Sequence, residues 1–339
     1  MWGKLNMVWE KEKVELRSIY SGSLIEYGKN DEHICVLEAD LMASASTNKF
    51  RDVFPDRTIN VGVAEANMIG VAAGLSAMGF IPFAHTFAPF ATRRCCDQVT
   101  LSVAYAGLNV KIVGSDPGVG AELNGGTHMS FEDIAIMRNI PGMTVFEPVD
   151  SVQFKKIFPQ ILSSYGPTYI RLFRKNAWSI YREEDEFTLG KGVLLKEGTD
   201  VSIFASGIMV KEALEAAEKL KDEGISAEVI NIHTIKPLDK EMVISSAAKT
   251  GCVVTSENAF VANGLGSAVD DCLSGTHPVP VLKVGVEDRF GEVGKIDYLQ
   301  KALGLTAENI VDKAHKAIEL KNEIKFTKDR LKKVISHKQ

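Results

Sequence analysis

Residues 57–74 read RTINVGVAEANMIGVAAG, a β-like run that passes directly into a helix-like run of small residues. Glu65 is the lone carboxylate of this stretch and stands where the first pattern changes to the second. A strand that leads into a helix is the repeating unit of α/β proteins. The stretch therefore predicts an α/β unit with a single acid at its turn.

The same alternation of strand-like and helix-like runs continues along the chain. In residues 209–224, MVKEALEAAEKLKDEG, apolar side chains recur three and four residues apart, and Gly224 is a natural C-terminal stop. Strand-like runs lie on either side of such helices: HICVLEAD, RTINVGVA, FIPFAHTF, NVKIVGSD, DVSIFASG, ISAEVINI, CVVTSEN and PVPVLKVG. We expect an α/β fold of two domains, each with a mostly parallel sheet flanked by helices.

A polar, turn-rich segment, KNAWSIYREEDEFTLGKG, separates the two expected domains. We place the first domain at residues 1–180 and the second at residues 192–321, because the alternation begins afresh on each side of this linker. The lysine-rich residues 322–339 are expected to form a solvated basic tail, although they could also continue as a helix.

The bulk composition is that of an ordinary soluble globular chain. Of its 339 residues, 45% are hydrophobic and 24% charged, and the formal net charge of -5 gives no reason to expect nucleic acid as a partner. No run reaches the roughly 18 apolar residues of a membrane span, and the N-terminus lacks the apolar core of a signal peptide. The five cysteines form no CxxC pair, so we expect reduced thiols and a cytoplasmic location.

Several common catalytic motifs are missing from the sequence. There is no GxxxxGKS/T loop, no GxSxG elbow and no HExxH pair, which excludes a P-loop and leaves hydrolase and zinc chemistry without support. GVGAELNG and GLGSAV fail the GxGxxG spacing of dinucleotide-binding loops. The seven histidines are scattered without metal-ligand spacing, so we predict no metal site on this chain.

Glu65 could be a plain acid that complements a helix dipole. The flanking runs VGVA and NMIGVAAG would leave its carboxylate in apolar surroundings, where an unpaired acid tends to hold its proton and suits exchange with a heteroaromatic nitrogen. Phe87 and Phe90 could present rings to a flat heterocycle, although such residues are more often core. A glycine-rich segment ending at His128 follows a strand-like run, where α/β proteins often place ligands.

Several dispersed motifs, taken in order, resemble one known family. GVAEANM, FAPF and LNGGTHMSFEDIAIMRNIPGMTVFEPVD resemble the pyrimidine-binding domain of transketolase and its thiamine-diphosphate relatives. DVSIFASGIMVKEALEAAEKL and FGEVGKIDYLQKALGLTAENIV are similar to the C-terminal domain of the same enzymes. The resemblance covers the chain from about Val14 to Lys321. It implies transfer of a two-carbon ketol unit from a phosphorylated or otherwise anionic ketose to an aldose.

The diphosphate-binding half of a transketolase has no counterpart in this sequence. In the family, a GDG-type motif holds the cofactor diphosphate and its Mg²⁺, and no GDG occurs here. The resemblance therefore implies the C-terminal subunit of a split transketolase, with the diphosphate and most Mg²⁺ contacts on a partner chain. It also implies a heterotetramer with two copies of each chain.

The resemblance assigns roles to several residues. Glu65 corresponds to the family glutamate that hydrogen-bonds a ring nitrogen of the aminopyrimidine and promotes its imino form. Phe87 and Phe90 correspond to aromatic residues that pack on the pyrimidine, and Asp40 to an acid near the thiazolium. His128 corresponds to a histidine that contacts substrate hydroxyls, but from the sequence alone it is as readily a capping loop residue.

Arg17, Ser44 and Arg174 fall where the family places phosphate-binding residues, and arginine suits that task through its forked donors. Two positions depart from the family. Asn124 replaces an aspartate that contacts a substrate hydroxyl, and Asp116 stands where a histidine of the phosphate cluster is usual. We therefore expect a different anionic ketose to fit as well as xylulose 5-phosphate. Changes at these two positions should alter substrate choice more than cofactor binding.

Two other functions remain open at this point. The β subunit of a 2-oxoacid dehydrogenase shares the pyrimidine domain and the split-chain arrangement, although LNGGTHMS resembles the transketolase sequence GPTHQ more closely. A non-catalytic partner subunit would share the fold, but it would not need to keep the acid, the two rings and the histidine named above. We expect the second domain to serve dimer contacts, and we assign His233 and Lys236 to a turn between a strand and a helix.

Overall fold

The first domain is built on a seven-stranded sheet. The computed structural model describes residues 9–336, with side chains to residue 327. The strands of this sheet are β1 (Ile34–Glu38), β2 (Thr58–Asn60), β3 (Ile81–Phe87), β4 (Lys111–Ser115), β5 (Thr144–Phe146), β6 (Thr168–Leu172) and β10 (Thr234–Lys236). They lie in the order β10-β5-β6-β4-β3-β1-β2, and neighbours are parallel except β10 with β5. β1, β4 and β6 are buried at every position because helices cover both faces of the sheet.

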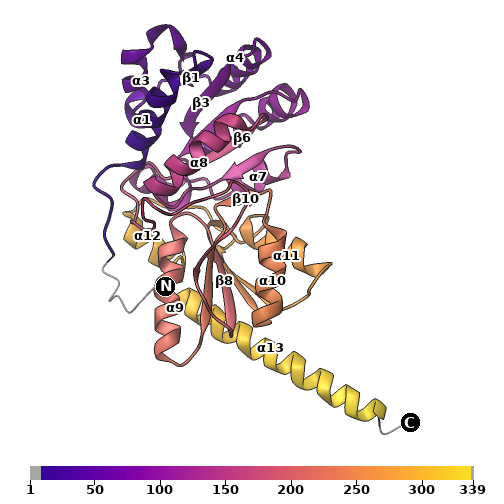
Figure 1. The fold of residues 1–339 in the computed structure, drawn as a ribbon. Helices are drawn as coiled ribbons and strands as arrows, with labels where there is room; N and C mark the ends of the chain where they lie inside the picture. Colours follow the sequence, from indigo (N-terminus) through magenta and orange to yellow (C-terminus); the bar gives the residue numbers. More distant parts are fainter. Residues whose placement is uncertain (1–8, 337–339) are drawn as a thin grey trace.

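Two groups of helices cover the two faces of this sheet (Figure 1). The helical elements are α1 (Leu16–Gly28), α2 (Met42–Ala45), α3 (Asn48–Val53), η1 (Pro55–Arg57), α4 (Glu65–Ala77), α5 (Ala88–Ala91), α6 (Cys96–Gln98), η2 (Val99–Tyr105), η3 (Gly118–Asn124), α7 (Asp133–Asn139) and α8 (Ser151–Ser163). α1 and α8 share one core cluster, which contains Tyr20, Phe83 and Phe158. α4 and η2 share a second cluster with Met68 and Ile112. The sheet thus lies between two apolar layers.

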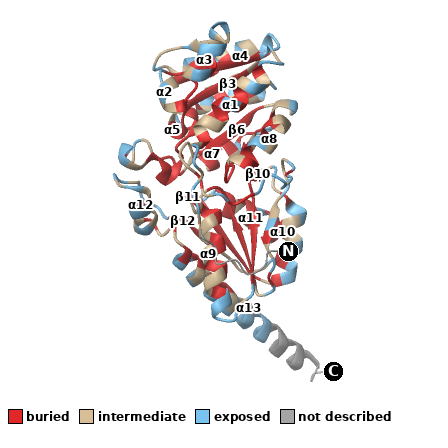
Figure 2. Cartoon of the chain, turned by 60° about the vertical axis from the view of Figure 1, so that its left-hand side comes forward, coloured by how far each residue is buried: buried red, intermediate tan, exposed pale blue. Residues whose placement is uncertain are grey.

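The second domain repeats this plan with a smaller sheet. Its strands are β7 (Val193–Lys196), β8 (Val201–Ala205), β9 (Ala227–Asn231), β11 (Val253–Phe260) and β12 (Val281–Val286), and its helices are α9 (Met209–Asp222), α10 (Lys240–Thr250), α11 (Leu265–Ser274), α12 (Ile296–Ala302) and α13 (Ala307–Ser336). The order is β12-β11-β8-β9-β7, with only β7 antiparallel to its neighbour. Both sheets form the buried centres of their domains (Figure 2). The predicted fold class is confirmed.

One short strand crosses from the second half of the chain into the first sheet. β10 pairs antiparallel with β5. His233, directly before β10, is fully buried, and its carbonyl oxygen accepts a hydrogen bond from the backbone N–H of Glu147. The assignment of His233 and Lys236 to a turn is wrong, because pairing with a distant strand leaves no trace in the local pattern. The domain limits 1–180 and 192–321 stay a prediction.

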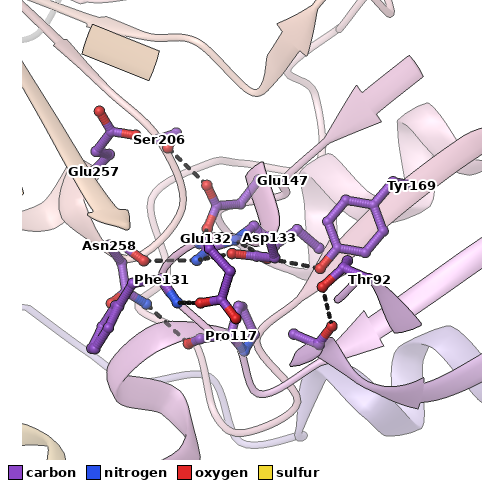
Figure 3. A network of polar contacts seen from close by, with 12 residues as sticks. Thr92, Pro117, Phe131, Glu132, Asp133, Glu147, Tyr169, Ser206, Glu257 and Asn258 are labelled. Atoms are coloured by element: carbon purple, nitrogen blue, oxygen red, sulfur yellow. Dashed lines mark hydrogen bonds and ion pairs between the residues drawn. The ribbon is translucent and has the colours of Figure 1, made fainter. Parts of the chain in front are cut away.

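A buried ionic network joins the two domains (Figure 3). Arg171 on β6 is completely buried; its Nε donates to Asp133 at 2.7 Å, and the guanidinium also pairs with Glu147. From the second domain, the hydroxyl of Ser206 donates to Glu147 at 2.7 Å, and the carbonyl oxygen of Asn258 accepts from Arg171 at 2.7 Å. Buried charges are compensated only while their partners stay in place. The network therefore ties the second domain to β6 of the first.

The lysine-rich C-terminal segment forms a helix up to Ser336, the second of the two structures expected for it. α13 runs from Ala307 to Ser336 and extends away from the body of the molecule (Figure 1). No glycine or proline interrupts residues 307–336, so the helix has no stop signal there. Residues 322–327 are exposed, as expected for a solvated basic segment. The ends of the predicted segments, residues 1–8 and 337–339, lie outside the described residues.

Candidate functional site

The carboxyl ends of the parallel strands in the first sheet bring distant parts of the chain together. β6, β4, β3 and β1 are neighbours and run in one direction, so the residues that follow them meet at one edge of the sheet. Phe87 ends β3, Asp116 follows β4 and Arg174 lies two residues beyond β6. Open α/β sheets bind ligands at this edge. The candidate site lies here.

Glu65 begins α4, after the turn that follows β2. Its side chain is 4% exposed, and its Oε1 accepts a hydrogen bond from Nη1 of Arg94 at 2.8 Å. The guanidinium carbon of Arg94 also lies 3.9 Å from the centre of the Phe90 ring. The expectation that the acid is unpaired is therefore wrong. The carboxylate is buried, but a cation from a later segment reaches it, and the residues flanking Glu65 do not indicate this contact.

Three rings cluster beside Arg94. The ring centre of His128 lies 5.2 Å from that of Phe90 and 5.9 Å from that of Phe87, and the two phenylalanine rings are 6.2 Å apart. All three pairs meet edge to face, a favourable arrangement for aromatic rings. Phe87 is buried and Phe90 only partly, so Phe90 is the ring that a ligand can reach. Because the hydroxyl of Thr127 lies 3.0 Å from Nδ1 of His128, a ligand contact would fall to Nε2.

Arg17, Ser44, Asp116 and Arg174 form a second set at the same edge, here named the anion group. Nη1 of Arg17 and Nη1 of Arg174 approach the carbonyl oxygen of Ser44, at 2.9 and 3.4 Å. Nε of Arg174 pairs with Oδ2 of Asp116 at 2.5 Å. Burial raises the pKa of Asp116 to about 6, although Arg174 acts in the opposite direction. The Arg174 guanidinium lies 5.2 Å from the Phe87 ring centre and so joins the anion group to the rings.

Two further predicted residues lie at the surface. Asp40 follows β1 and is exposed; its backbone N–H donates to Oδ1 of Asn60 at 3.0 Å, and its Oδ1 accepts from Nδ2 of Asn60 at 3.2 Å. Asn124 is exposed at the end of η3. Gly125 follows with a φ of 76°, which turns the chain toward His128. The roles assigned to Asp40 and Asn124 stay predictions.

The sequence-based predictions do not include a buried polar cluster that lies beside Arg174. Glu38 on β1 and His85 on β3 are fully buried, with 3.7 Å between Oε1 and Nδ1. Thr47 donates to Glu38 at 2.5 Å. Burial raises the pKa of Glu38 to about 8, and burial together with Arg174 lowers the pKa of His85 to about 3. Ionisable residues inside the apolar runs HICVLEAD and FIPFAHTF are the signal that could have indicated this cluster.

The described residues offer neither a metal-binding cluster nor a membrane-spanning helix. Among residues 9–336, no group of three His, Cys, Asp or Glu side chains could hold a metal ion. Within the same range, no helix combines the length and apolar character needed to cross a membrane. All five cysteines are free thiols. A buried acid, one reachable ring and the arginines Arg17 and Arg174 fit a flat heterocycle that lies next to an anion.

Both halves of the chain match known domains. Residues 12–178 match the pyrimidine-binding domain of transketolase, and residues 190–310 match the transketolase C-terminal domain. The chain belongs to the transketolase family. Glu65, the rings and the anion group all lie in the transketolase pyrimidine-binding match.

Individual transketolase relatives cover most of the chain. The chain is 64% identical over 307 residues to the 6-deoxy-6-sulfo-D-fructose transketolase subunit SqwH of Clostridium sp. (strain MSTE9), and the match covers 91% of this chain and 95% of that protein. It is 34% identical over 298 residues to a subunit of the apulose-4-phosphate transketolase of Phocaeicola vulgatus, with coverage of 88% and 95%. A solved structure, described as a split gene transketolase in an inactive beta4 tetramer, has a TM-score of 0.84 and 44% identity, and the match covers 91% of this chain and 100% of that one.

These comparisons confirm the predicted family and subunit type. Both transketolase relatives are subunits, and the split-gene structure spans the same part of the enzyme. The chain is therefore the C-terminal subunit of a split transketolase, and neither a 2-oxoacid dehydrogenase nor a non-catalytic subunit is favoured. Membership of this family implies dependence on thiamine diphosphate, and the split-subunit form implies a second subunit.

Proposed function

We propose that this chain binds the pyrimidine end of thiamine diphosphate in a two-chain transketolase, which transfers a two-carbon ketol unit from a sulfonated ketose to an aldose. The observation that carries the proposal is the continuous line of contacts from Glu65 through Arg94, Phe90 and Phe87 to Arg174. This line joins a buried acid, ring faces and an anion-binding group along one edge of the sheet.

The chain's own residues would orient the cofactor and the substrate. Thiamine diphosphate supplies the nucleophilic carbon that takes up the two-carbon unit. We assign the proton exchange with a pyrimidine nitrogen to Glu65, because its carboxyl group is buried beside the rings at the start of α4. Phe90 offers a ring face for stacking, with Phe87 packed behind it. We assign three further contacts: Asp40 with the thiazolium side, and Asn124 and Nε2 of His128 with substrate hydroxyls.

The sulfonated substrate class is supported by similarity and by the anion group. The relative at 64% identity is named for 6-deoxy-6-sulfo-D-fructose, whereas the relative at 34% is named for a phosphorylated ketose. We take the substrate class from the more similar of the two. Arg17 and Arg174 both supply forked donors that can bind the oxygen atoms of an anionic sugar end.

We infer that a partner chain holds the cofactor diphosphate and Mg²⁺, in a cytoplasmic heterotetramer with two copies of each chain. α4, which begins at Glu65, packs against η2. Large apolar side chains are exposed on or next to these two helices: Val63, Met78, Leu101 and Tyr105. Exposed large apolar side chains on neighbouring elements are typical of a protein interface. The free cysteines agree with a reducing compartment.

Reconstitution tests this function. The chain is mixed with a GDG-containing partner chain, thiamine diphosphate and Mg²⁺, and ketol transfer from 6-deoxy-6-sulfo-D-fructose is measured. Glu65→Gln keeps the size of the side chain but removes its proton exchange, so kcat should fall by about 10²–10⁴-fold. Glu241→Gln, at an exposed position of α10, is the matched control and should keep wild-type turnover. An unaffected Glu65→Gln enzyme would contradict the role of Glu65, and a wild-type enzyme inactive on every ketose would contradict the function.

A further inference from the structure

The charges around the anion group balance pair by pair. Three ion pairs lie there: Arg17 with Glu15, Arg174 with Asp116, and Lys175 with Glu122. His85 adds no charge, because burial and Arg174 lower its pKa to about 3. A site whose cations are all paired has a weaker positive potential than one with two free arginines. A dianion should therefore bind here little more tightly than a monoanion, because no unpaired cation compensates its second charge.

Asp116 is the most buried of the three carboxylates. Its side chain is 1% exposed, whereas those of Glu15 and Glu122 are 36% and 23% exposed. Water and salt screen a buried charge less than an exposed one, so the carboxylate of Asp116 acts strongly on any anion that Arg174 binds. Its backbone has a φ of 52°, which Asn tolerates as Asp does. The charge can therefore be removed without changing the backbone.

We propose that Asp116 sets the charge of the terminal group that the enzyme accepts, so that a sulfonate is favoured over a phosphate. The inference rests on the proposed function, since it concerns the anionic end of the ketose. A sulfonate carries a single negative charge at neutral pH, whereas a phosphate monoester carries about 1.5 to 2. Arg174 can bind the oxygen atoms of either group. The additional charge of the phosphate meets the buried carboxylate of Asp116, and like charges placed together are disfavoured.

A change of charge at constant shape tests this specificity. In the assembled two-chain enzyme, kcat/KM is measured for 6-deoxy-6-sulfo-D-fructose and for fructose 6-phosphate at pH 7.5. Asp116→Asn should shift the ratio of the two values toward the phosphate by at least about tenfold. Asp222→Asn, at an exposed position at the end of α9, changes the net charge equally and should leave the ratio unchanged. If Asp116 only positions Arg174, Asp116→Asn lowers kcat/KM equally for both substrates. An unchanged ratio of the two values would therefore overturn the inference.

The pH dependence of the wild-type enzyme gives a second readout. As the pH falls from 7.5 to 6, the phosphate and Asp116 both take up protons. The kcat/KM for fructose 6-phosphate should therefore rise relative to that for 6-deoxy-6-sulfo-D-fructose. The charged groups facing Asp116 are Arg174, Lys175 and Glu122. In Asp116→Asn this relative rise should be smaller. If the ratio of the two kcat/KM values depends on pH equally in the variant and the wild type, the inference is contradicted.

Two controls separate the possible failures. If Asp116→Asn does not fold, Asp116→Gly removes the same charge at a backbone position that suits glycine, and the same ratio is measured. If the wild-type enzyme with its partner transfers a ketol unit from neither ketose, the proposed function fails before any variant is made. If the wild-type enzyme is active but neither neutral variant shifts the ratio, only the inference about Asp116 is wrong.

Discussion

Removal of the Arg94 side chain should tighten the binding of thiamine diphosphate to the assembled enzyme. Arg94 donates to Glu65 at 2.8 Å, and its guanidinium lies 3.9 Å from the Phe90 ring centre, so one side chain covers both the acid and the ring face assigned to the pyrimidine. Since 45% of the Arg94 side chain is exposed, it can swing into solvent. We therefore expect that the cofactor has to displace Arg94 from two contacts before it can bind.

The energies of these two contacts set the size of the expected effect. An ion pair with one half-exposed partner contributes about 0.2–1 kcal/mol. A cation–π contact at an exposed site contributes about 0.5–1 kcal/mol. Their sum of roughly 0.7–2 kcal/mol corresponds to a Kd for thiamine diphosphate that is about 3- to 30-fold lower in Arg94→Ala than in the wild type.

Titration calorimetry of the two-chain enzyme with thiamine diphosphate, at saturating Mg²⁺, measures this Kd directly. Arg93→Ala is the matched control, because Arg93 is 50% exposed and pairs with Glu132 at 2.8 Å. It should bind the cofactor as the wild type does. Weaker binding by Arg94→Ala would refute the reasoning, since Arg94 would then be a ligand of the cofactor and not its competitor.

Two further predictions concern stability and are measured by urea unfolding. Arg171→Met leaves the buried carboxylates of Asp133 and Glu147 without their cation and should lower the free energy of unfolding by about 3–5 kcal/mol. The exposed Arg51→Met should lower it by at most ~1 kcal/mol, and equal losses would contradict the role of the buried ionic network between the domains. Burial raises the pKa of Glu38 from 4.5 to about 8, so between these values the folded state keeps a proton that the unfolded state has lost. The contribution of Glu38 to the free energy of unfolding therefore declines as the pH rises from 5 to 8, by at most ~1.4 kcal/mol per pH unit. Glu38→Gln should remove that decline, and an unchanged pH slope would speak against it.

The fold and the family could be predicted because their signals are local. Apolar runs and helical spacing each report on a few neighbouring residues, and eight of the twelve strands in the described part of the chain coincide with the predicted apolar runs. The other four, β5, β6, β7 and β10, lie outside those runs. The change of pattern at Glu65 marks the start of α4 correctly for the same reason. Even the unusual residue at position 116 is visible in the sequence, because it interrupts a glycine-rich segment directly after a strand.

The partners of these residues could not be predicted, because they come from other strands and helices. Arg94 reaches Glu65 only after β3 and the short helix α5 have brought the chain back past the start of α4. Arg174 meets Asp116 because β6 lies next to β4, an order that no local pattern encodes. β10 lies in the first sheet for the same kind of reason, since its three residues are too few to show a periodicity.

Exposure explains why the two arginine–carboxylate pairs of this site should act differently on a ligand. The Arg94 side chain is 45% exposed, so its pair with Glu65 is weakened by water and can be broken when a ligand arrives. The Arg174 side chain is 17% exposed and its partner Asp116 is 1% exposed, so separating them would leave a carboxylate buried without a cation. A ligand should therefore be able to break the Arg94–Glu65 pair. It has to bind beside an Arg174–Asp116 pair that stays intact, with the carboxylate of Asp116 still charged. We therefore expect the first pair to control how tightly the cofactor binds, and the second to control which anionic end of the substrate is accepted.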